Sequence, residues 1–135
     1  MIADEKESFQ LKRREIYNRI IYILDRYLPH KYKRAVLGCF YNTHLLVPTV
    51  KIFYYTDGSN EYAEFIARTE NSDIAASELS DLCEELHSLM CREGSKWTSF
   101  TFTRERIGRF KAKFGYEKIN SVNHIFLLNW RSKYF

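Results

Sequence analysis

The stretch that decides the fold is WTSFTFTRERIGRFKAKF, residues 97–114. Its first part, Trp97 to Thr103, alternates strictly between two sets of side chains, and its last part alternates Phe and Ala with lysines. A period of two is typical of β-strands, and Gly108 suits a turn between them. We therefore predict a hairpin closed by Arg104–Arg109. The predicted faces are Thr98, Phe100 and Phe102 against Trp97, Ser99, Thr101 and Thr103 in the first strand, and Phe110, Ala112 and Phe114 against Lys111 and Lys113 in the second.

Two further strands are predicted upstream of this hairpin, at Arg34–Tyr41 and Val47–Tyr55, because both segments are rich in β-branched and aromatic residues. Asn42-Thr43-His44 is predicted to connect them. Asp57-Gly58 then supplies a turn, after which Glu61–Ala67 is predicted to return as a third strand. These segments predict a meander of three antiparallel strands.

Three segments have the periodicity of helices. The first, Glu7–Leu28, has an apolar stripe and is ended by Pro29. Its stripe is Phe9, Leu11, Ile16, Ile20, Ile23, Leu24 and Tyr27. The second is predicted to be capped by Asn71 or Ser72 and to end at Gly94. Its core stripe is Ala75, Leu79, Leu82, Leu86, Leu89 and Met90.

The last predicted helix follows a cap at Asn120 or Ser121 and carries Phe126, Trp130 and Tyr134 at a spacing of four; a final strand is the competing interpretation. The predicted order is α-β-β-β-α-β-β-α. This order predicts an α+β fold, in which helices pack on an antiparallel sheet of about five strands. With 135 residues and no linker or repeat, residues 1–135 are expected to form a single domain.

The composition indicates a cytoplasmic protein. Met1–Gln10 is polar and acid-rich, unlike a secretory signal, and the apolar runs are far shorter than the roughly 20 residues that span a bilayer. The cysteines, Cys39, Cys83 and Cys91, are odd in number and form no CxxC pair. We therefore expect a reducing compartment and no membrane partner.

Charge is strongly segregated along the chain, although the formal net charge is only +4. Thr56–Glu85 contains nine acidic residues and one basic residue, Arg68, and so carries −8. The remainder of the chain therefore carries +12. Such an asymmetry predicts an acidic surface that suits a basic partner and speeds its capture.

The sequence does not bring catalytic or metal-ligating residues together at any recognisable spacing. We therefore expect a protein that is not an enzyme and binds no cofactor or metal. The four histidines are scattered without metal-ligand spacing, and the five glycines form no phosphate-binding loop. Cys83 and His87 lie one helical turn apart, which would allow a hydrolase dyad or two metal ligands. Cys83 borders the apolar stripe, however, which favours a buried structural thiol. Glu84 and Glu85 point about 100° apart on a helix and indicate a solvated acidic face.

Basic residues of the hairpin raise the alternative of a nucleic-acid-binding surface. They are Arg104, Arg106, Arg109, Lys111 and Lys113. A stacking surface needs rings and cations on the same face, whereas Phe110 and Phe114 alternate with the lysines. The sequence therefore favours solubilising charges on an edge strand.

Several segments, taken in order, resemble the YezG-like immunity protein family. They include Ile16-Tyr17, Leu28-Pro29, Phe53-Tyr54-Tyr55 before Asp57-Gly58, Glu93-Gly94, the run Trp97–Phe102, Gly108–Lys111, Phe114, Tyr116-Glu117, Trp130 and Tyr134. The resemblance covers about Glu15 to Tyr134. It implies a non-enzymatic antidote that binds the C-terminal domain of a cognate bacterial toxin, often a nuclease, and it implies no catalytic residue.

The charge map and the resemblance together predict a toxin-binding surface. Its acidic side chains would meet lysines and arginines of a basic nuclease, blocking the active site or substrate access, with two tyrosines as aromatic anchors. The predicted residues are Tyr55, Asp57, Glu61, Tyr62, Glu64, Asp73, Glu78, Asp81 and Glu85. The alternative function is a nucleic-acid-binding module that uses the basic remainder of the surface.

Overall fold

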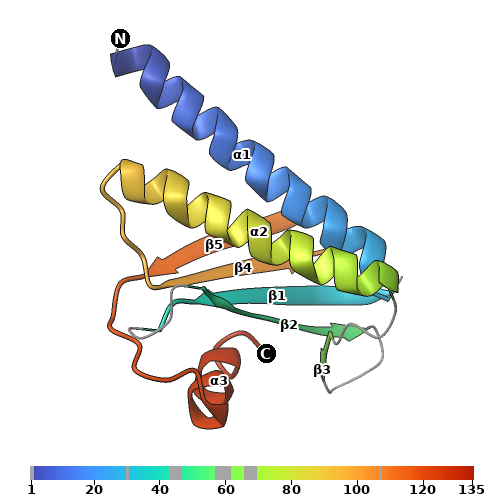
Figure 1. Ribbon diagram of the computed structural model, residues 1–135. Helices are drawn as coiled ribbons and strands as arrows, with labels where there is room; N and C mark the ends of the chain where they lie inside the picture. The colour runs from blue at the N-terminus through green and yellow to red at the C-terminus, as the bar shows by residue number, and fades with distance from the viewer. Residues whose placement is uncertain (1, 30, 43–46, 57–61, 66–69, 107) are drawn as a thin grey trace.

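The structure, a computed structural model, describes residues 2–29, 31–42, 47–56, 62–65, 70–106 and 108–135. It confirms the predicted α+β class, the single domain built on one sheet, and the order α-β-β-β-α-β-β-α (Figure 1). The elements are α1 (Ile2–Tyr27), β1 (Tyr32–Phe40), β2 (Thr49–Thr56), β3 (Ala63–Glu64), α2 (Glu70–Arg92), β4 (Ser99–Glu105), β5 (Arg109–Gly115) and α3 (His124–Arg131).

The sheet has five antiparallel strands in the order β3-β2-β1-β4-β5. The central strand β1 aligns Leu37 with Ile52 of β2 on one side and with Phe102 of β4 on the other. Every residue from Ala35 to Phe40 is buried, because helices cover this strand on both faces of the sheet. Double burial explains the nearly continuous apolar run that the sequence shows in this strand.

Helices α1 and α2 lie side by side on one face of the sheet (Figure 1). Their apolar stripes meet inward-facing residues of β1 and β4, such as Leu37, Phe100 and Phe102, in the larger core. The helix residues of this core are Ile16, Tyr17, Ile20, Ile23, Leu24, Ala75, Leu79, Cys83, Leu86, Leu89 and Met90. Leu11 was predicted to join them but is 57% exposed, because at 100° per residue it lies about 160° around the helix axis from Phe9, which does pack against this core.

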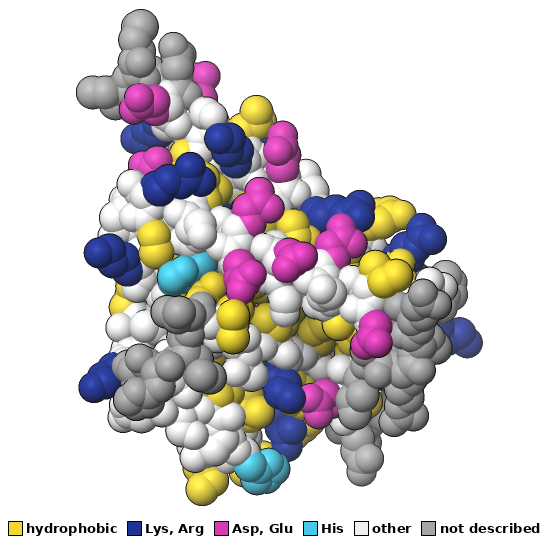
Figure 2. All heavy atoms as spheres, in the orientation of Figure 1, with side chains coloured by type: hydrophobic (Ala, Val, Ile, Leu, Met, Phe, Trp, Pro, Cys, Tyr) yellow, Lys and Arg dark blue, Asp and Glu magenta, His cyan; other side chains and the backbone are white. Residues whose placement is uncertain are grey.

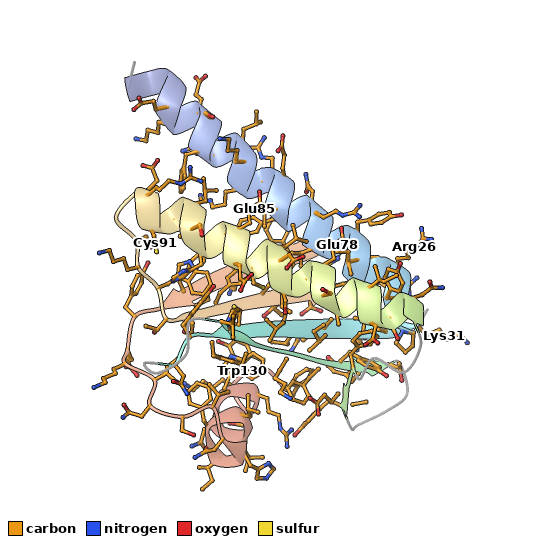
Figure 3. All side chains as sticks on the ribbon, viewed as in Figure 1. Arg26, Lys31, Glu78, Glu85, Cys91 and Trp130 are labelled. Atoms are coloured by element: carbon orange, nitrogen blue, oxygen red, sulfur yellow. The ribbon has the colours of Figure 1, made fainter. Side chains whose placement is uncertain are left out.

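Helix α3 packs on the opposite face and forms a second core with β1 and β2. Trp130 is its centre, and Figure 3 shows this side chain between α3 and the sheet. The indole N–H of Trp130 donates a hydrogen bond to Thr101 Oγ1 at 2.9 Å. A Cβ at Gly38 would lie 2.6 Å from Trp130, so this glycine permits the close approach of α3 to β1.

Most turns and caps follow from local sequence. Gly94 has a positive φ of 87°, as predicted for the end of α2. The amide of Ser95 donates to the carbonyl of Met90 and that of Gly94 to Cys91, which is the pattern of a glycine C-cap. Gly108, with φ 93°, lies between β4 and β5 in the predicted hairpin turn.

Several predicted boundaries were wrong. Helix α2 begins at Glu70, so Asn71 and Ser72 lie inside it rather than cap it. The last helix is capped by Asn123, whose Oδ1 accepts a hydrogen bond from the amide of Phe126 at 2.9 Å; the cap is neither Asn120 nor Ser121. The competing final strand is also excluded, because residues 124–131 are helical. Of the predicted third strand, Ala63–Glu64 pairs with β2, and residues 61, 66 and 67 lie outside the described residues. The predicted Asp57-Gly58 turn and residues 43 and 44 of the predicted connection also lie outside them.

The prediction for Trp97 was wrong as well. Alternation placed this side chain on the face opposite Phe100, but its ring lies 5.8 Å from both Phe100 and Phe114 in the larger core. Strand β4 begins only at Ser99, so the alternating rule does not extend back to residue 97. Thr101 does lie on the face opposite Phe100, as predicted, and there it contacts Trp130 of α3.

Candidate functional site

The acidic residues of α2 gather on the outer side of this helix. The helix contains six acidic residues and one basic residue, Arg92. Asp73, Asp81 and Glu85 are exposed and lie within an arc of about 120°, as expected from 100° per residue. Figure 2 shows acidic side chains collected over α2 in the middle of this face, with lysines and arginines to either side. We call Asp73, Asp81 and Glu85 the acidic face of α2.

Glu84 belongs to the same arc, although it was not among the predicted binding residues. Its position is about 20° from that of Asp73 around the helix axis, and its side chain is half-buried. The spacing of eleven residues between Asp73 and Glu84 is the sequence signal that would have identified it.

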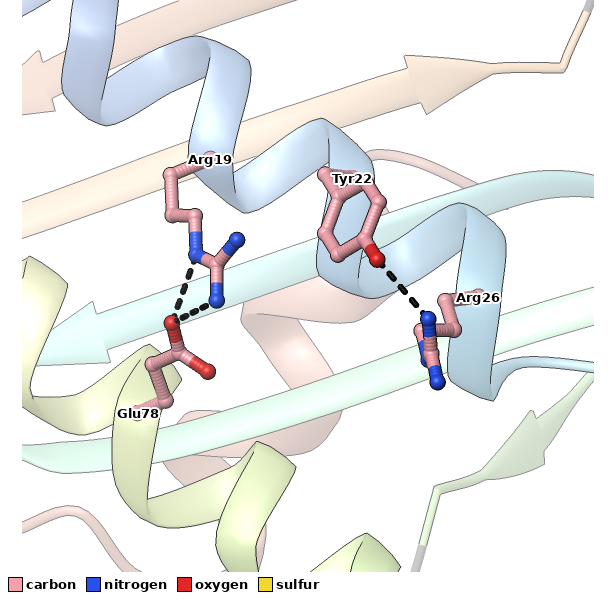
Figure 4. A network of polar contacts seen from close by, with 4 residues as sticks. All are labelled: Arg19, Tyr22, Arg26 and Glu78. Atoms are coloured by element: carbon pink, nitrogen blue, oxygen red, sulfur yellow. Dashed lines mark hydrogen bonds and ion pairs between the residues drawn. The ribbon is translucent and has the colours of Figure 1, made fainter.

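Glu78 is not free to meet a partner, because it joins α2 to α1. Its Oε1 accepts a hydrogen bond from Arg19 Nε at 2.6 Å (Figure 4). Beside this pair, Arg26 Nη1 donates to the hydroxyl of Tyr22 at 2.8 Å. Both partners of the Arg19–Glu78 pair are partly exposed, so the pair contributes about 1 kcal/mol or less to stability.

Glu64 connects the acidic helix to the edge of the sheet. It lines a hollow of about 440 Å³ together with Ala76 and Ser80 of α2. Strand β3 and α2 therefore adjoin, as a common acidic surface requires. Lys51 Nζ lies 3.3 Å from Glu64 Oε1, however, and partly compensates its charge.

The two predicted aromatic anchors lie away from the acidic face. Tyr55 and Tyr62 contact the C-terminal residue Phe135, with ring centroids 5.7 Å and 4.9 Å from it. The guanidinium of Arg131 lies 4.8 Å from the ring centre of Tyr62. Both tyrosines thus hold the C-terminal segment on the α3 side of the sheet. The other two predicted residues, Asp57 and Glu61, lie outside the described residues.

Cys83 is fully buried in the larger core, as the sequence favoured. The cysteine that the sequence reasoning missed is Cys91, one turn beyond His87, whose Sγ lies 3.8 Å from both ring nitrogens of His87. His87 Nε2 lies 3.0 Å from the carbonyl oxygen of Trp97 and is its hydrogen-bond donor. The imidazole also stacks on Tyr41 at 4.0 Å. The equal spacing of Cys83, His87 and Cys91 gave no means of choosing between the two cysteines.

Burial lowers the pKa of His87 from its ordinary 6.5, and the hydrogen bond to Trp97 opposes this only in part. The unfolded chain therefore binds more protons than the folded chain as the pH falls below 6.5. We expect the free energy of unfolding to decrease from pH 6.5 through the lower folded pKa, and His87→Gln to remove part of that decrease. Denaturant titrations between pH 4.5 and 8 would measure it, with exposed His124→Gln as the control. Equal pH profiles for His87→Gln and the wild type would contradict this assignment.

The described residues contain no group of three or more metal-ligating side chains close enough to share an ion. None of the helices in these same parts of the chain has the length and apolar character needed to cross a membrane.

A comparison with models of known protein families found no match. A comparison with curated protein sequences found no similar protein either. The surface of α2 therefore has to be interpreted from its own geometry and charge.

Proposed function

We propose that this protein is a cytoplasmic immunity protein that binds and neutralises the C-terminal domain of a cognate bacterial toxin, a basic nuclease. It acts as a binding protein and catalyses no reaction. The observation that supports this proposal most directly is the acidic face of α2. No ion pair involves Asp73, Asp81 or Glu85 within the part of the chain that the structure describes. Exposed and uncompensated carboxylates suit a partner rich in lysine and arginine.

The acidic face is also built on a rigid support. Buried Leu79, Cys83 and Leu86 anchor the inner side of α2, and the Arg19–Glu78 pair ties it to α1. The backbone positions that carry the carboxylates are therefore fixed before a partner arrives, which limits the entropy lost on binding. A basic nuclease uses its cations to bind phosphates, so a fixed row of carboxylates competes for those cations and blocks substrate access.

The direct test is co-expression with the toxin domain encoded beside the gene for this protein. We expect the toxin domain alone to stop growth of the host, and co-expression of this protein to restore it. The two proteins should also co-purify, and purified immunity protein should abolish nucleic-acid cleavage in vitro. Continued toxicity despite equal amounts of both folded proteins would contradict the proposal.

A further inference from the structure

The α3 side of the sheet is only partly covered. Helix α3 packs on β1 and β2 through Val36, Phe40 and Phe53, whereas β4 and β5 lie on the other side of β1 from β2. Two hollows of about 490 and 960 Å³ occupy the space between these two strands and the C-terminal segment. Lys133 and Tyr134 line both hollows, which therefore adjoin. We call the pair of hollows the β5 groove.

Cations from two separate parts of the chain line the β5 groove. Lys111 and Lys113 come from β5, and Lys133 comes from the segment after α3. All three are exposed, and none has an ion-pair partner among the described residues. Two acidic residues also line the groove: Glu105 is already bound to Arg34, whose Nε lies 2.6 Å from Glu105 Oε1, and Glu117 is exposed and lines the hollow that holds Lys113. Residues 104–135 contain eight basic and two acidic residues, a net charge of +6.

Aromatic rings join these cations in the groove, both from β5 itself and from the chain that follows it. Phe110 and Phe114 stack on Phe102 and Phe100, on the face of β5 that its alternation predicts, and they also border the two hollows. Tyr134, Phe135 and Tyr116 line the hollows as well. Tyr116 is 59% exposed. Rings and cations thus meet on one surface because the chain after β5 folds back beside the lysine face of this strand.

We propose that the β5 groove binds single-stranded nucleic acid. Lys111, Lys113 and Lys133 bind backbone phosphates, and the exposed ring of Tyr116 and the half-buried ring of Tyr134 provide stacking surfaces for bases. Lys111 and Lys113 are separated by about 7 Å along one face of β5, so they contact different phosphates of an extended strand. An acidic peptide would also satisfy the cations, but it would give the tyrosine rings no corresponding partner.

The groove and the acidic face of α2 lie on opposite sides of the sheet, because α2 covers one face and α3 with the C-terminal segment lies on the other (Figure 1). A nucleic acid in the groove therefore does not cover the surface proposed to bind the toxin. This separation makes the two proposals independent, and each can fail alone.

The test is fluorescence anisotropy with single-stranded DNA and RNA of about 12 nucleotides, a duplex of equal length, and a poly-glutamate peptide. We expect the single strands to bind most tightly, with an affinity that falls steeply with salt. Lys111→Ala, Lys113→Ala and Lys133→Ala together should weaken single-strand binding by at least tenfold and reduce the salt slope by about 2. Tyr116→Ala should weaken it by about fivefold or more without affecting poly-glutamate.

The matched control removes three exposed lysines from α1 and the segment after it, Lys6, Lys12 and Lys31, and leaves the net charge equal to that of the groove variant. Circular dichroism and thermal unfolding confirm that all variants are folded. Equal losses in the groove and control variants would show non-specific attraction and overturn the proposal. If poly-glutamate binds more tightly than either single strand, the proposal is overturned in favour of an acidic protein partner. If the duplex binds more tightly than either single strand, it is overturned in favour of a double helix.

Discussion

Replacing Trp130 with alanine is expected to reduce the free energy of unfolding by about 3–5 kcal/mol, as for other large buried aromatic residues. Trp130 is 7% exposed and is the buried residue of α3. The substitution removes its contacts with Phe40 and Phe53, at ring distances of 5.1 and 6.0 Å, and its hydrogen bond to Thr101. A helix of eight residues is not stable alone, so we expect α3 to detach from the sheet.

Equilibrium unfolding in urea measures this effect, and Leu128→Ala is the matched control on the same helix. Leu128 is 44% exposed, so its truncation should cost less than about 1 kcal/mol. A second variant, Trp130→Phe, keeps most of the packing but leaves Thr101 without its donor, and should have an intermediate effect. Equal stabilities of the Trp130→Ala and Leu128→Ala variants would show that α3 contributes little to the fold.

Reversing the charges of the acidic face, by Asp73→Lys, Asp81→Lys and Glu85→Lys together, is expected to weaken toxin binding by about 100-fold. This figure corresponds to about 1 kcal/mol for each exposed charge pair lost. The reversed charges also repel a basic partner during its approach, so most of the loss of affinity should come from a lower association rate constant. Stopped-flow or surface plasmon resonance measurements at low and high salt would separate the rate constants.

The control for this triple variant reverses Glu5, Glu7 and Glu117, which are exposed and lie outside α2. Net charge then changes equally in both variants. If the control weakens toxin binding as much as the α2 variant does, the attraction is a property of total charge, and the acidic face is not the contact surface. Asp73→Asn, Asp81→Asn and Glu85→Gln should have an intermediate effect and a weaker salt dependence than the wild type.

Local patterns predicted most of the fold because each depends on residues that are neighbours in sequence. The alternation of Phe100 and Phe102 with Thr101 defined β4, and Gly94 and Gly108 marked two chain reversals. Such rules fail where an element ends. Trp97 lies just before β4, and its side chain is placed by contacts with His87 and Phe114 rather than by strand pleating.

Placement of the candidate site was predicted only in part. Asp73, Asp81 and Glu85 could be grouped from sequence because one helix carries all three. Tyr55 and Tyr62 could not be placed, because their position depends on Phe135, about 75 residues further along the chain.

The sequence by itself determined the order of the elements, the segregation of charge and the face of α2 that carries its carboxylates, since all three depend on local spacing. Only the tertiary structure decided which separate segments meet. It brought Arg19 to Glu78, and it brought Tyr134 beside the lysines of β5. These contacts depend on how α1 and α3 pack on opposite faces of one sheet, and the periodicity of a segment contains no information about the partner against which it packs.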